Sequence, residues 1–449
     1  MTQSITPGSL LRFWQGGRDL ELIFERAHLR ISALGNNTAR LRLGPGGKFA
    51  ARRSWDVVAP DDDFGTPLLA LREDGESIRF EMGAFRVIYQ RGGGLYFERA
   101  GQRFCVLNEL PGWDEEGAVA ARLATDPAEH FYGFGERTGL LEKSGSRMTC
   151  WATDPGHMHG PDVDSMYIAI PFAMALRPGL AWGLFFHNTF RSEFDLTQPG
   201  ELALRADGGE LDCYVMCAAT PAELVSAFSA LVGRTPMPPL WALGYHQSRW
   251  SYSSAQEVRD LVEGFRRRGI PLDAVHLDID YMDGYRDFTW NRQNFPDPAR
   301  LTRDLKAQGV RVVAITDAGV KVDPAYEVYT SGQAQDAFVR NAQGEEAHAY
   351  VWPDESVWPD FSRPAVRAWW ANCQRKLLAD GIAGIWNDMN EPVTFNRPFS
   401  EGGGGTGTLP LDALQGPKDE RTTHAELHNL YGLGMAQACY EGLERDLNG

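Results

Sequence analysis

The stretch LDAVHLDID (272–280) begins a strand–helix–strand pattern that decides the fold of the C-terminal half. We predict that it forms a strand. The next pattern, DPARLTRDLKAQG (297–309), predicts a helix with Asp297 as its N-cap. VRVVAITD (310–317) then predicts a second strand. Two strands that are joined by a helical crossover are expected to run parallel.

The same alternation extends in both directions along the chain. Further strands are expected at WALGYHQS (241–248) and IAGIWNDMN (382–390), and further helices at SSAQEVRDLVEGFRRRG (253–269), where Ser254 and Glu257 form a capping box, and at RPAVRAWWANCQRKLLADG (363–381). Four strands that alternate with three helices predict a parallel sheet or barrel, which we place at residues 236–449.

The N-terminal half has a different pattern, made almost entirely of strands. Alternation, aromatic and β-branched residues and glycine turns mark ELIFERAHLRISAL (21–34), SIRFEMGAFRVIYQRGGGLYFERAG (77–101) and GLAWGLFFHNTFRSEFDL (179–196). The first helical pattern is TPAELVSAFSALVG (220–233). We therefore predict a β-sandwich for residues 1–235.

The composition is that of a globular chain with more than one domain. Its 449 residues exceed an ordinary single domain, and 43% of them are hydrophobic. The formal net charge of −16 argues against nucleic acid or an anionic membrane surface as the main partner. It suits a protein that acts on a neutral substrate.

The N-terminus MTQSITPGSLLRFWQGG (1–17) lacks the basic region and apolar core of a signal peptide. No apolar run reaches the roughly 18 residues of a membrane span, so we expect a cytoplasmic protein with no membrane partner. The six cysteines are scattered, and the closest pair, Cys213 and Cys217, has no matching His or Cys ligands. We therefore expect no metal, no cofactor and no disulfide framework.

Carboxylates stand at the ends of three consecutive predicted strands of the C-terminal half. They are Asp278 and Asp280, then Asp317, then Asp388. In a parallel α/β barrel the C-terminal ends of the strands surround one opening, where active sites are built. The sequence therefore predicts that GIWNDMNEP (384–392) is a buried strand that ends at a catalytic site.

Six motifs in order make the chain recognisable. They are HFYGFGERTG (130–139), MPPLWALGYHQSRWSY (237–252), IPLDAVHLDIDYMDGYRDFTW (270–290), VWPDF (357–361), GIWNDMNEP (384–392) and THAELHNLYGLGMA (423–436). With these motifs the chain resembles glycoside hydrolase family 31, the retaining α-glucosidase family, over nearly its whole length. The resemblance implies an N-terminal β-sandwich of the galactose-mutarotase-like type and a following (β/α)8 barrel.

The resemblance also implies a role for several residues, with an α-glucoside or oligosaccharide as the substrate. Asp388 looks like the catalytic nucleophile, and Asp278 looks like the acid that holds a hydroxyl of the glucose being cleaved. Glu391 matches the glutamate that accompanies the nucleophile. The apolar wall around the sugar matches Trp352, Trp386 and Met389, and Asp154 in CWATDPG (150–156) is similar to an acid that an N-terminal loop contributes.

Other interpretations of these residues remain open at the level of sequence. Asp280 shares the strand face of Asp278 and is an alternative ligand for the sugar. Asp154 is also explained by a turn, both tryptophans by core packing, and Glu391 by a supporting hydrogen bond. Asn387 and Asn390 are placed to donate hydrogen bonds that keep the nucleophile ionised, on a face that the sequence does not reveal.

The resemblance covers the first four βα units of the barrel, which gives the chain the first half of a (β/α)8 TIM-type barrel. Family members continue into a part that supplies the acid/base aspartate, so we expect this chain to be an N-terminal portion that is inactive in isolation. Alternatives are an α-xylosidase or a glucosyl transferase of the same family, and a non-catalytic carbohydrate-binding protein. The motifs D-I-D-Y-M and D-M-N-E-P favour the glucosidase branch.

Overall fold

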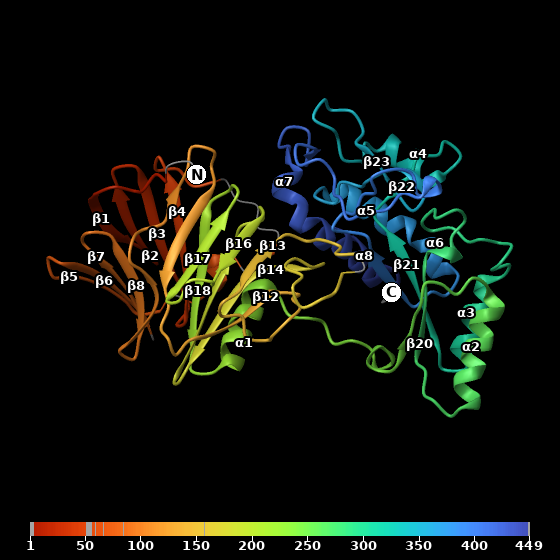
Figure 1. The fold of residues 1–449 in the computed structure, drawn as a ribbon, viewed down its shortest axis with the longest axis horizontal. Coiled ribbons are helices and arrows are strands. Elements are labelled where there is room, and N and C mark those ends of the chain that lie inside the picture. Colours follow the sequence, from red (N-terminus) through yellow and green to blue (C-terminus); the bar gives the residue numbers. More distant parts are fainter. Residues whose placement is uncertain are drawn as a thin grey trace. The chain divides into compact units, whose positions relative to one another are not determined.

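The chain divides into two compact units, Met1–Thr235 and Pro236–Gly449, which are described one at a time (Figure 1). The computed structural model describes residues 4–50, 56–58, 60–65, 67–83, 85–156 and 158–447. Among these residues no helix is both long enough and apolar enough to cross a membrane.

Within the described residues, the N-terminal unit consists mainly of two antiparallel sheets. The first has the order β1 (Leu10–Gly16), β2 (Asp19–Phe24), β3 (Ala27–Leu34), β4 (Thr38–Pro45), β18 (Leu211–Ala218), β15 (Leu180–Phe186), β14 (Ala169–Arg177) and β12 (His130–Gly135). The second has the order β13 (Arg147–Cys150), β16 (Ser192–Asp195), β17 (Glu201–Ala206), β11 (Val119–Ala124), β9 (Gln102–Leu107), β8 (Gly94–Arg99), β7 (Phe85–Gln90), β6 (Ser77–Met82) and β5 (Leu69–Glu73), with β10 (Gly112–Trp113) beside β11.

Apolar side chains from both sheets form one core, which confirms the predicted β-sandwich. Strands β15 and β18 are buried at every position, not at alternate positions. The reason is a second layer, because α1 (Pro221–Val232) packs Leu224 and Leu231 on their outer face. Thr220 begins this helix with a capping box to Glu223. A short 3-10 turn lies at η1 (Asp61–Asp63).

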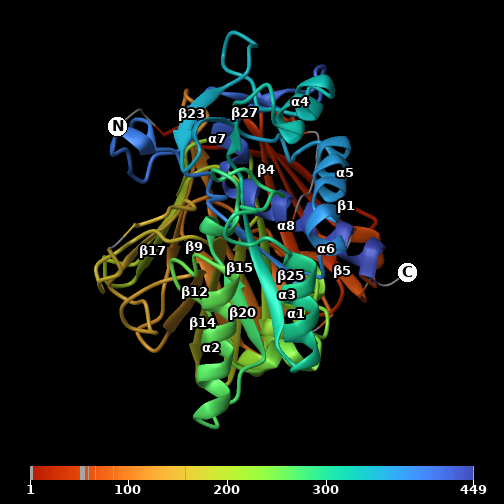
Figure 2. The same ribbon diagram turned by 90° about the vertical axis from the view of Figure 1, so that its right-hand side faces the viewer.

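The C-terminal unit is built on a parallel sheet. In the part of the chain that the structure describes, its order is β19 (His246–Gln247), β20 (Ala274–Leu277), β21 (Arg311–Asp317) and β25 (Gly384–Asp388). Helices α2 (Ala255–Arg267) and α3 (Pro298–Ala307) lie side by side, and α3 packs on β21 (Figure 2). Asp297 caps α3 as predicted, because its carboxylate accepts a hydrogen bond from the Arg300 N–H at 2.9 Å.

Two predicted elements of this unit were partly wrong. The strand expected at 241–248 is reduced to β19, because Pro239 begins the 3-10 turn η2 (Leu240–Leu243) and the Trp241 ring folds back to stack on His246. The helix expected at 363–381 is broken into α5 (Pro364–Cys373) and α6 (Arg375–Ala379). The break is at Gln374, whose buried side-chain amide donates to the Ala438 carbonyl at 3.2 Å.

Several elements were not predicted. They are α4 (Glu327–Ala334) and α7 (His424–Leu427), a small sheet of β22 (Val320–Lys321), β24 (Asp354–Val357) and β23 (His348–Val351), the pair β26 (Leu414–Gln415) and β27 (Thr422–Thr423), and the 3-10 turns η3 (Ile279–Tyr281), η4 (Phe399–Glu401) and η5 (His428–Leu430). The helix of the expected fourth βα unit is α8 (Tyr431–Leu447). Helix α8 packs on α5 and β25 and completes the core of the unit.

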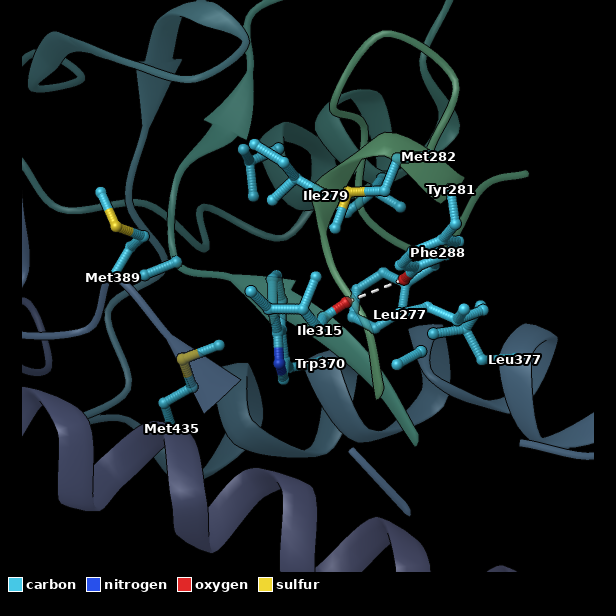
Figure 3. Close-up of a cluster of buried hydrophobic side chains, with 14 of the residues drawn as sticks. Leu277, Ile279, Tyr281, Met282, Phe288, Ile315, Trp370, Leu377, Met389 and Met435 are labelled. Atoms are coloured by element: carbon cyan, nitrogen blue, oxygen red, sulfur yellow. Dashed lines mark hydrogen bonds between the residues drawn. The ribbon is translucent and has the colours of Figure 1, made fainter. Parts of the chain in front are cut away.

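Part of that core lies directly beneath the tips of β20 and β21 (Figure 3). The buried Tyr281 hydroxyl donates a hydrogen bond to the Ile315 carbonyl at 2.8 Å, drawn as the dashed line in Figure 3. This bond ties the turn after β20 to the neighbouring strand. The strand tips are therefore held on a rigid, apolar base.

Candidate active site

The register of the parallel sheet decides which side chains share a face. Val313 of β21 pairs with Gly384 of β25, and Asp317 pairs with Asp388. Partners in adjacent parallel strands point to the same face, and so do alternate residues of one strand. One face therefore carries His276 of β20, Ile315 and Asp317 of β21, and Trp386 and Asp388 of β25. The contact of the His276 and Trp386 rings, with centroids 6.1 Å apart, agrees with this assignment.

Asp388 ends β25 and is half-buried, so a ligand can reach it. Its neighbour across the sheet is Asp317, one strand spacing of about 4.8 Å away. Asp317 is only 4% exposed. The two carboxyls at these strand tips therefore lie in different environments, one open to a ligand and one closed.

Asp278 follows β20 directly and caps the short turn η3. Its Oδ1 atom accepts a hydrogen bond from the Ile279 N–H at 2.7 Å. Burial raises the pKa of Asp278, the Ile279 N–H lowers it, and the charge of Asp280 raises it further. Asp280 lies one turn further on, where it hydrogen-bonds with the Tyr285 hydroxyl. Of the two acids, Asp278 continues the face that carries Asp388.

A buried carboxyl pair underlies the strand tips. Oδ1 of Asp287, which is 1% exposed, accepts a hydrogen bond from the Asp317 N–H at 2.8 Å. Burial raises the pKa of Asp317 well above its usual range, and the charges of Asp287, Asp388, Asp278 and Glu391 raise it further. Burial also raises the pKa of Asp287, to about 8. Four other carboxyl groups therefore lie within electrostatic reach of Asp317.

Glu391 and Met389 are both buried close to Asp388. Glu391 is 7% exposed and contributes to the electrostatic field at Asp317. Met389, also 7% exposed, has a left-handed backbone with φ of 54° and belongs to the core cluster drawn in Figure 3. Core packing therefore explains Met389 by itself, and its predicted contact with a sugar stays a prediction.

The two predicted tryptophans occupy different surroundings. Trp386 lies on the same sheet face as Asp388 and packs edge-on against His276. His276 in turn is 3.0 Å from His246, measured between Nε2 and Nδ1, and burial lowers the pKa of His276. Trp352 lies between β23 and β24, and its ring packs edge-on against Phe395 at 4.9 Å between centroids.

Trp352 is part of a cluster of aromatic rings in the loops. The other members in contact with it are Trp250, Phe395 and Phe399. Trp250 is 60% exposed, so this cluster reaches the surface. Because Phe395 follows Glu391 by four residues, the cluster is attached to the loop that leaves the Asp388 strand tip. Its use as a sugar platform stays a prediction.

Asp154 belongs to the N-terminal unit and has a local partner. Its Oδ1 atom accepts a hydrogen bond from the Gly156 N–H at 2.8 Å, which closes a turn around Pro155. The turn accounts for an aspartate at this position. Its predicted contribution to the sugar site stays a prediction.

The expectation that Asn387 supports the nucleophile was wrong. Asn387 alternates with Asp388 along β25, so its side chain points to the opposite face and hydrogen-bonds with Cys439 of α8. Asn390 is also close to this helix, because a Cβ atom added at Gly432 of α8 would lie 3.4 Å from its Oδ1 atom. The Asn387 amide therefore links the strand end to α8, and Asn390 lies against the same helix.

Sequence reasoning missed Asp287. It lies in the loop DGYRDFTW (283–290), where polar residues are ordinary and no periodicity marks a buried position. The loop is fixed by Tyr326, whose hydroxyl donates to the Asp287 carbonyl at 2.8 Å. Asp317 was noted as a strand tip but was not assigned to the site. Among the described residues, no group of three or more His, Cys, Asp or Glu side chains is placed to hold a metal ion.

Two family models match the chain. The model described as "Glycosyl hydrolases family 31 TIM-barrel domain" matches residues 235–448. The model described as "Glycosyl hydrolase 31 N-terminal galactose mutarotase-like domain" matches residues 28–195. The first model matches the unit with the parallel sheet, and the second matches most of the unit with the two antiparallel sheets.

Similar proteins of known sequence are α-glucosidases. Alpha-glucosidase 2 of Bacillus thermoamyloliquefaciens is 44% identical over 335 residues, which are 74% of this chain and 42% of that protein. Lysosomal alpha-glucosidase of Mus musculus is 34% identical over 344 residues, which are 71% of this chain and 35% of that protein. The chain thus spans less than half the length of these curated relatives.

Solved structures show the same fold at low sequence identity. A GH31 dextranase of Flavobacterium johnsoniae, complexed with glucose, has a TM-score of 0.86 at 23% identity and covers 98% of this chain and 53% of its own. A GH31 α-xylosidase from a soil metagenome, complexed with xylose, has a TM-score of 0.82 at 19% identity and covers 97% of this chain and 64% of its own. These likenesses support the architecture of both units.

Proposed function

Because the chain belongs to glycosyl hydrolase family 31, we propose that it supplies the nucleophile and a sugar-holding carboxylate of a retaining α-glucosidase. The observation that carries this proposal is the placement of Asp278 and Asp388 at the tips of β20 and β25, which belong to one parallel sheet. The relative of 44% identity is an α-glucosidase, which supports glucose as the sugar.

The half-buried Asp388 has the position of a group that attacks a ligand. In a retaining mechanism its carboxylate attacks the anomeric carbon while a second carboxyl protonates the leaving oxygen, and water then hydrolyses the glycosyl-aspartate. The buried neighbours of Asp388 do not compete for this task, because a carboxyl without access to the sugar cannot attack it. Asp278 is assigned to a sugar hydroxyl, and Trp386 to the wall beside it.

The remaining assigned residues have supporting tasks. We assign Glu391 to the positioning of Asp388, since it is buried three residues further along the same loop. Met389 and Trp352 are assigned to the walls around the sugar. All of these assigned roles serve one proposed reaction, the hydrolysis of a terminal α-linked glucose.

Trapping of the glycosyl-enzyme tests the assignment directly. The protein, as its gene encodes it, is treated with a fluorinated glucosyl fluoride that forms the intermediate quickly and releases it slowly. Peptide mapping should find the label on Asp388. A label on another carboxyl would refute the assignment, and no label together with tight sugar binding would indicate the non-catalytic carbohydrate-binding alternative.

A second candidate activity is α-xylosidase, which the structural likeness to such an enzyme favours. The two activities differ in whether the site accommodates the hydroxymethyl group of glucose. The ratio of kcat/KM for an aryl α-glucoside and the matching aryl α-xyloside separates them. We expect a ratio well above one, and a ratio below one would assign the protein to the xylosidases. Glu263→Gln, on the exposed side of α2, is the matched control and should leave the ratio unchanged.

A further inference from the structure

We propose that Asp317 keeps a proton at neutral pH and acts as a neutral positioning residue beside Asp388. This inference rests on the proposed role of Asp388 as the nucleophile. It assigns to Asp317 a task that differs from nucleophile, proton donor and sugar ligand. Because Asp317 is neutral, the two adjacent strand tips carry two carboxyl groups but only one negative charge, that of Asp388.

The first argument is the position of Asp317. It is paired in register with Asp388, so both side chains leave the same face of the sheet at the same level. It is 4% exposed, whereas Asp388 is half-buried. An ionised carboxylate at such a buried position is costly unless donors or cations surround it.

The second argument is the shortage of donors around the pair of buried acids. Within the described residues, Oδ1 of Asp317 and Oδ2 of Asp287 have no hydrogen-bond partner. The nearby tyrosine hydroxyls do not fill this gap, because Tyr281 donates to the Ile315 carbonyl and Tyr326 donates to the Asp287 carbonyl. Protonation removes the charge that these missing donors would have to stabilise.

The third argument is the charge of the groups that face Asp317 from each element. Asp287 faces it from the loop after η3, Asp278 from the tip of β20, Asp388 from β25 and Glu391 from the following loop. All four of these groups are acids, so each of them raises the pKa of Asp317 when it is ionised. Like charges at this distance favour the neutral form of the group that is most buried.

Asp317 holds its proton more strongly than its partner Asp287 does. Oδ1 of Asp287 accepts the Asp317 N–H at 2.8 Å, and a donor of this kind stabilises the charged form of the carboxyl that receives it. Asp317 receives no such bond at Oδ1 among the described residues. The two groups titrate as a coupled pair, in which the first proton to be lost comes from Asp287.

Infrared spectroscopy of the protein, as its gene encodes it, tests the protonation. A carboxylic acid has a carbonyl stretch that is distinct from that of a carboxylate and that shifts on 13C-aspartate labelling. We expect this band in the wild-type protein at neutral pH, and its clear weakening in Asp317→Asn, in which the proton of Asp287 remains. Absence of the band from the wild type would overturn the proposal without any variant.

Asp360→Asn is the matched control for burial. Asp360 is 2% exposed, but it accepts hydrogen bonds from the Gly416 N–H at 2.8 Å and from the Ser362 hydroxyl at 2.5 Å. Burial raises the pKa of Asp360, and these donors lower it. The acid band of Asp317 should survive in Asp360→Asn, because Oδ1 of Asp317 receives no donor of this kind among the described residues. Its loss there, with retention in Asp317→Asn, would assign the proton to Asp360 and overturn the proposal.

Kinetics test the positioning role, with α-glucosyl fluoride as a substrate whose leaving group needs no proton donor. Asn is neutral and nearly isosteric with a protonated Asp, so Asp317→Asn should keep kcat/KM within about threefold of wild type, and Asp317→Ala should lose at least about tenfold. The wild-type rate should fall at alkaline pH when Asp317 ionises, and this fall should be absent in Asp317→Asn. Equal losses in both variants, or the same alkaline fall in Asp317→Asn, would overturn the positioning role.

These outcomes are separable from those of the proposed function. Trapping on a carboxyl other than Asp388 would refute the nucleophile and with it the positioning role. The acid band would still decide whether Asp317 is protonated. A label on Asp388 without an acid band would keep the function and remove this inference.

Discussion

Asp317 and Asp388 are direct partners across the parallel sheet, one at the end of β21 and the other at the end of β25. The two carboxyl groups differ in how deeply they are buried. Asp388 is accessible to a ligand, whereas Asp317 is enclosed with Asp287 beneath it. Adjacent carboxyls that differ in environment can take different protonation states and different tasks. The predictions below depend on this difference.

The first prediction concerns the nucleophile. Asp388→Asn replaces the attacking carboxylate by an amide of the same shape that attacks poorly. Loss of covalent catalysis should lower kcat by at least about 10³-fold, which is a barrier increase of roughly 4 kcal/mol. Sugar binding should change much less, because Asp278 and Trp386 remain. Steady-state kinetics on an aryl α-glucoside measure both effects, and near-normal turnover would refute the role of Asp388.

The second prediction concerns Asp278, which is expected to hold a sugar hydroxyl with a charge-assisted hydrogen bond. Asp278→Asn should cost about 1.5–3 kcal/mol of binding in both the ground state and the transition state, or roughly 10- to 100-fold in kcat/KM. A part of this loss should appear in KM, unlike the loss in Asp388→Asn. Asp280→Asn is the comparison, because it tests the alternative ligand. A larger loss in Asp280→Asn would exchange the two roles.

The third prediction is a pH dependence of stability. The pKa of Asp287 in the folded protein is about 8, and burial raises that of Asp317 well above its usual range, whereas both are near 3.8 when unfolded. Between these values the folded state keeps protons that the unfolded state has released. The free energy of unfolding should therefore fall as pH rises from about 4 to about 8, by about 1.4 kcal/mol per pH unit for each retained proton.

Urea unfolding of the C-terminal unit, followed by tryptophan fluorescence at about pH 5, 6 and 7, measures this slope. Asp287→Asn removes one titrating group and should make the slope shallower. Glu263→Gln serves as the control on an exposed helix face and should leave it unchanged. A slope that is the same in Asp287→Asn and wild type would contradict the prediction.

The fourth prediction separates the two faces of β25. Asn387 points away from the site and hydrogen-bonds with Cys439, so Asn387→Ala should destabilise the unit by about 1 kcal/mol through the loss of that bond. The same change should leave kcat within about threefold of wild type. Parallel measurements of unfolding and turnover are sufficient. A large kinetic loss at unchanged stability would mean that Asn387 serves the nucleophile after all.

The fifth prediction concerns the base of the site. Tyr281→Phe removes the hydroxyl that donates to the Ile315 carbonyl and leaves a buried acceptor without this donor. The expected cost is about 1–3 kcal/mol in the unfolding of the C-terminal unit. Tyr440→Phe, on the exposed side of α8, is the control and should have almost no effect. Equal effects of the two changes would show that the bond does not stabilise the unit.

Local signals made much of this fold predictable. Helix α3 was placed correctly because Asp297 and Pro298 mark its start, and β21 because VRVVAITD is mostly apolar before its terminal Asp. The strand predicted at 241–248 was mostly wrong, because Leu240–Leu243 form the 3-10 turn η2 and only His246–Gln247 form a strand. An edge strand of this length has too few residues to show a periodic pattern. In the small sheet around Trp352, β22 pairs with β24 across more than thirty residues of sequence, which no local pattern reveals. Strands β23 and β24 form a local hairpin, but each has only four residues.

The site was predictable to the extent that it lies at strand tips. Asp278, Asp317 and Asp388 follow apolar runs, and position after a strand is a signal that sequence carries. Asp287 follows no strand, and its burial depends on the Tyr326 hydroxyl and on the path of a loop. The face occupied by Asn387 depended on the exact register of β25, which only the paired strands define.

Strands β15 and β18 of the N-terminal unit are enclosed by the opposite sheet on one face and by α1 on the other. Neither strand has a solvent-facing position at which a polar residue is tolerated. Divergence among homologous chains is therefore restricted in these strands to exchanges between apolar residues of similar volume. Edge strands such as β1, which is largely exposed, can vary freely. Sequence similarity among homologous chains should therefore persist longer in β15 and β18 than in the edge strand β1.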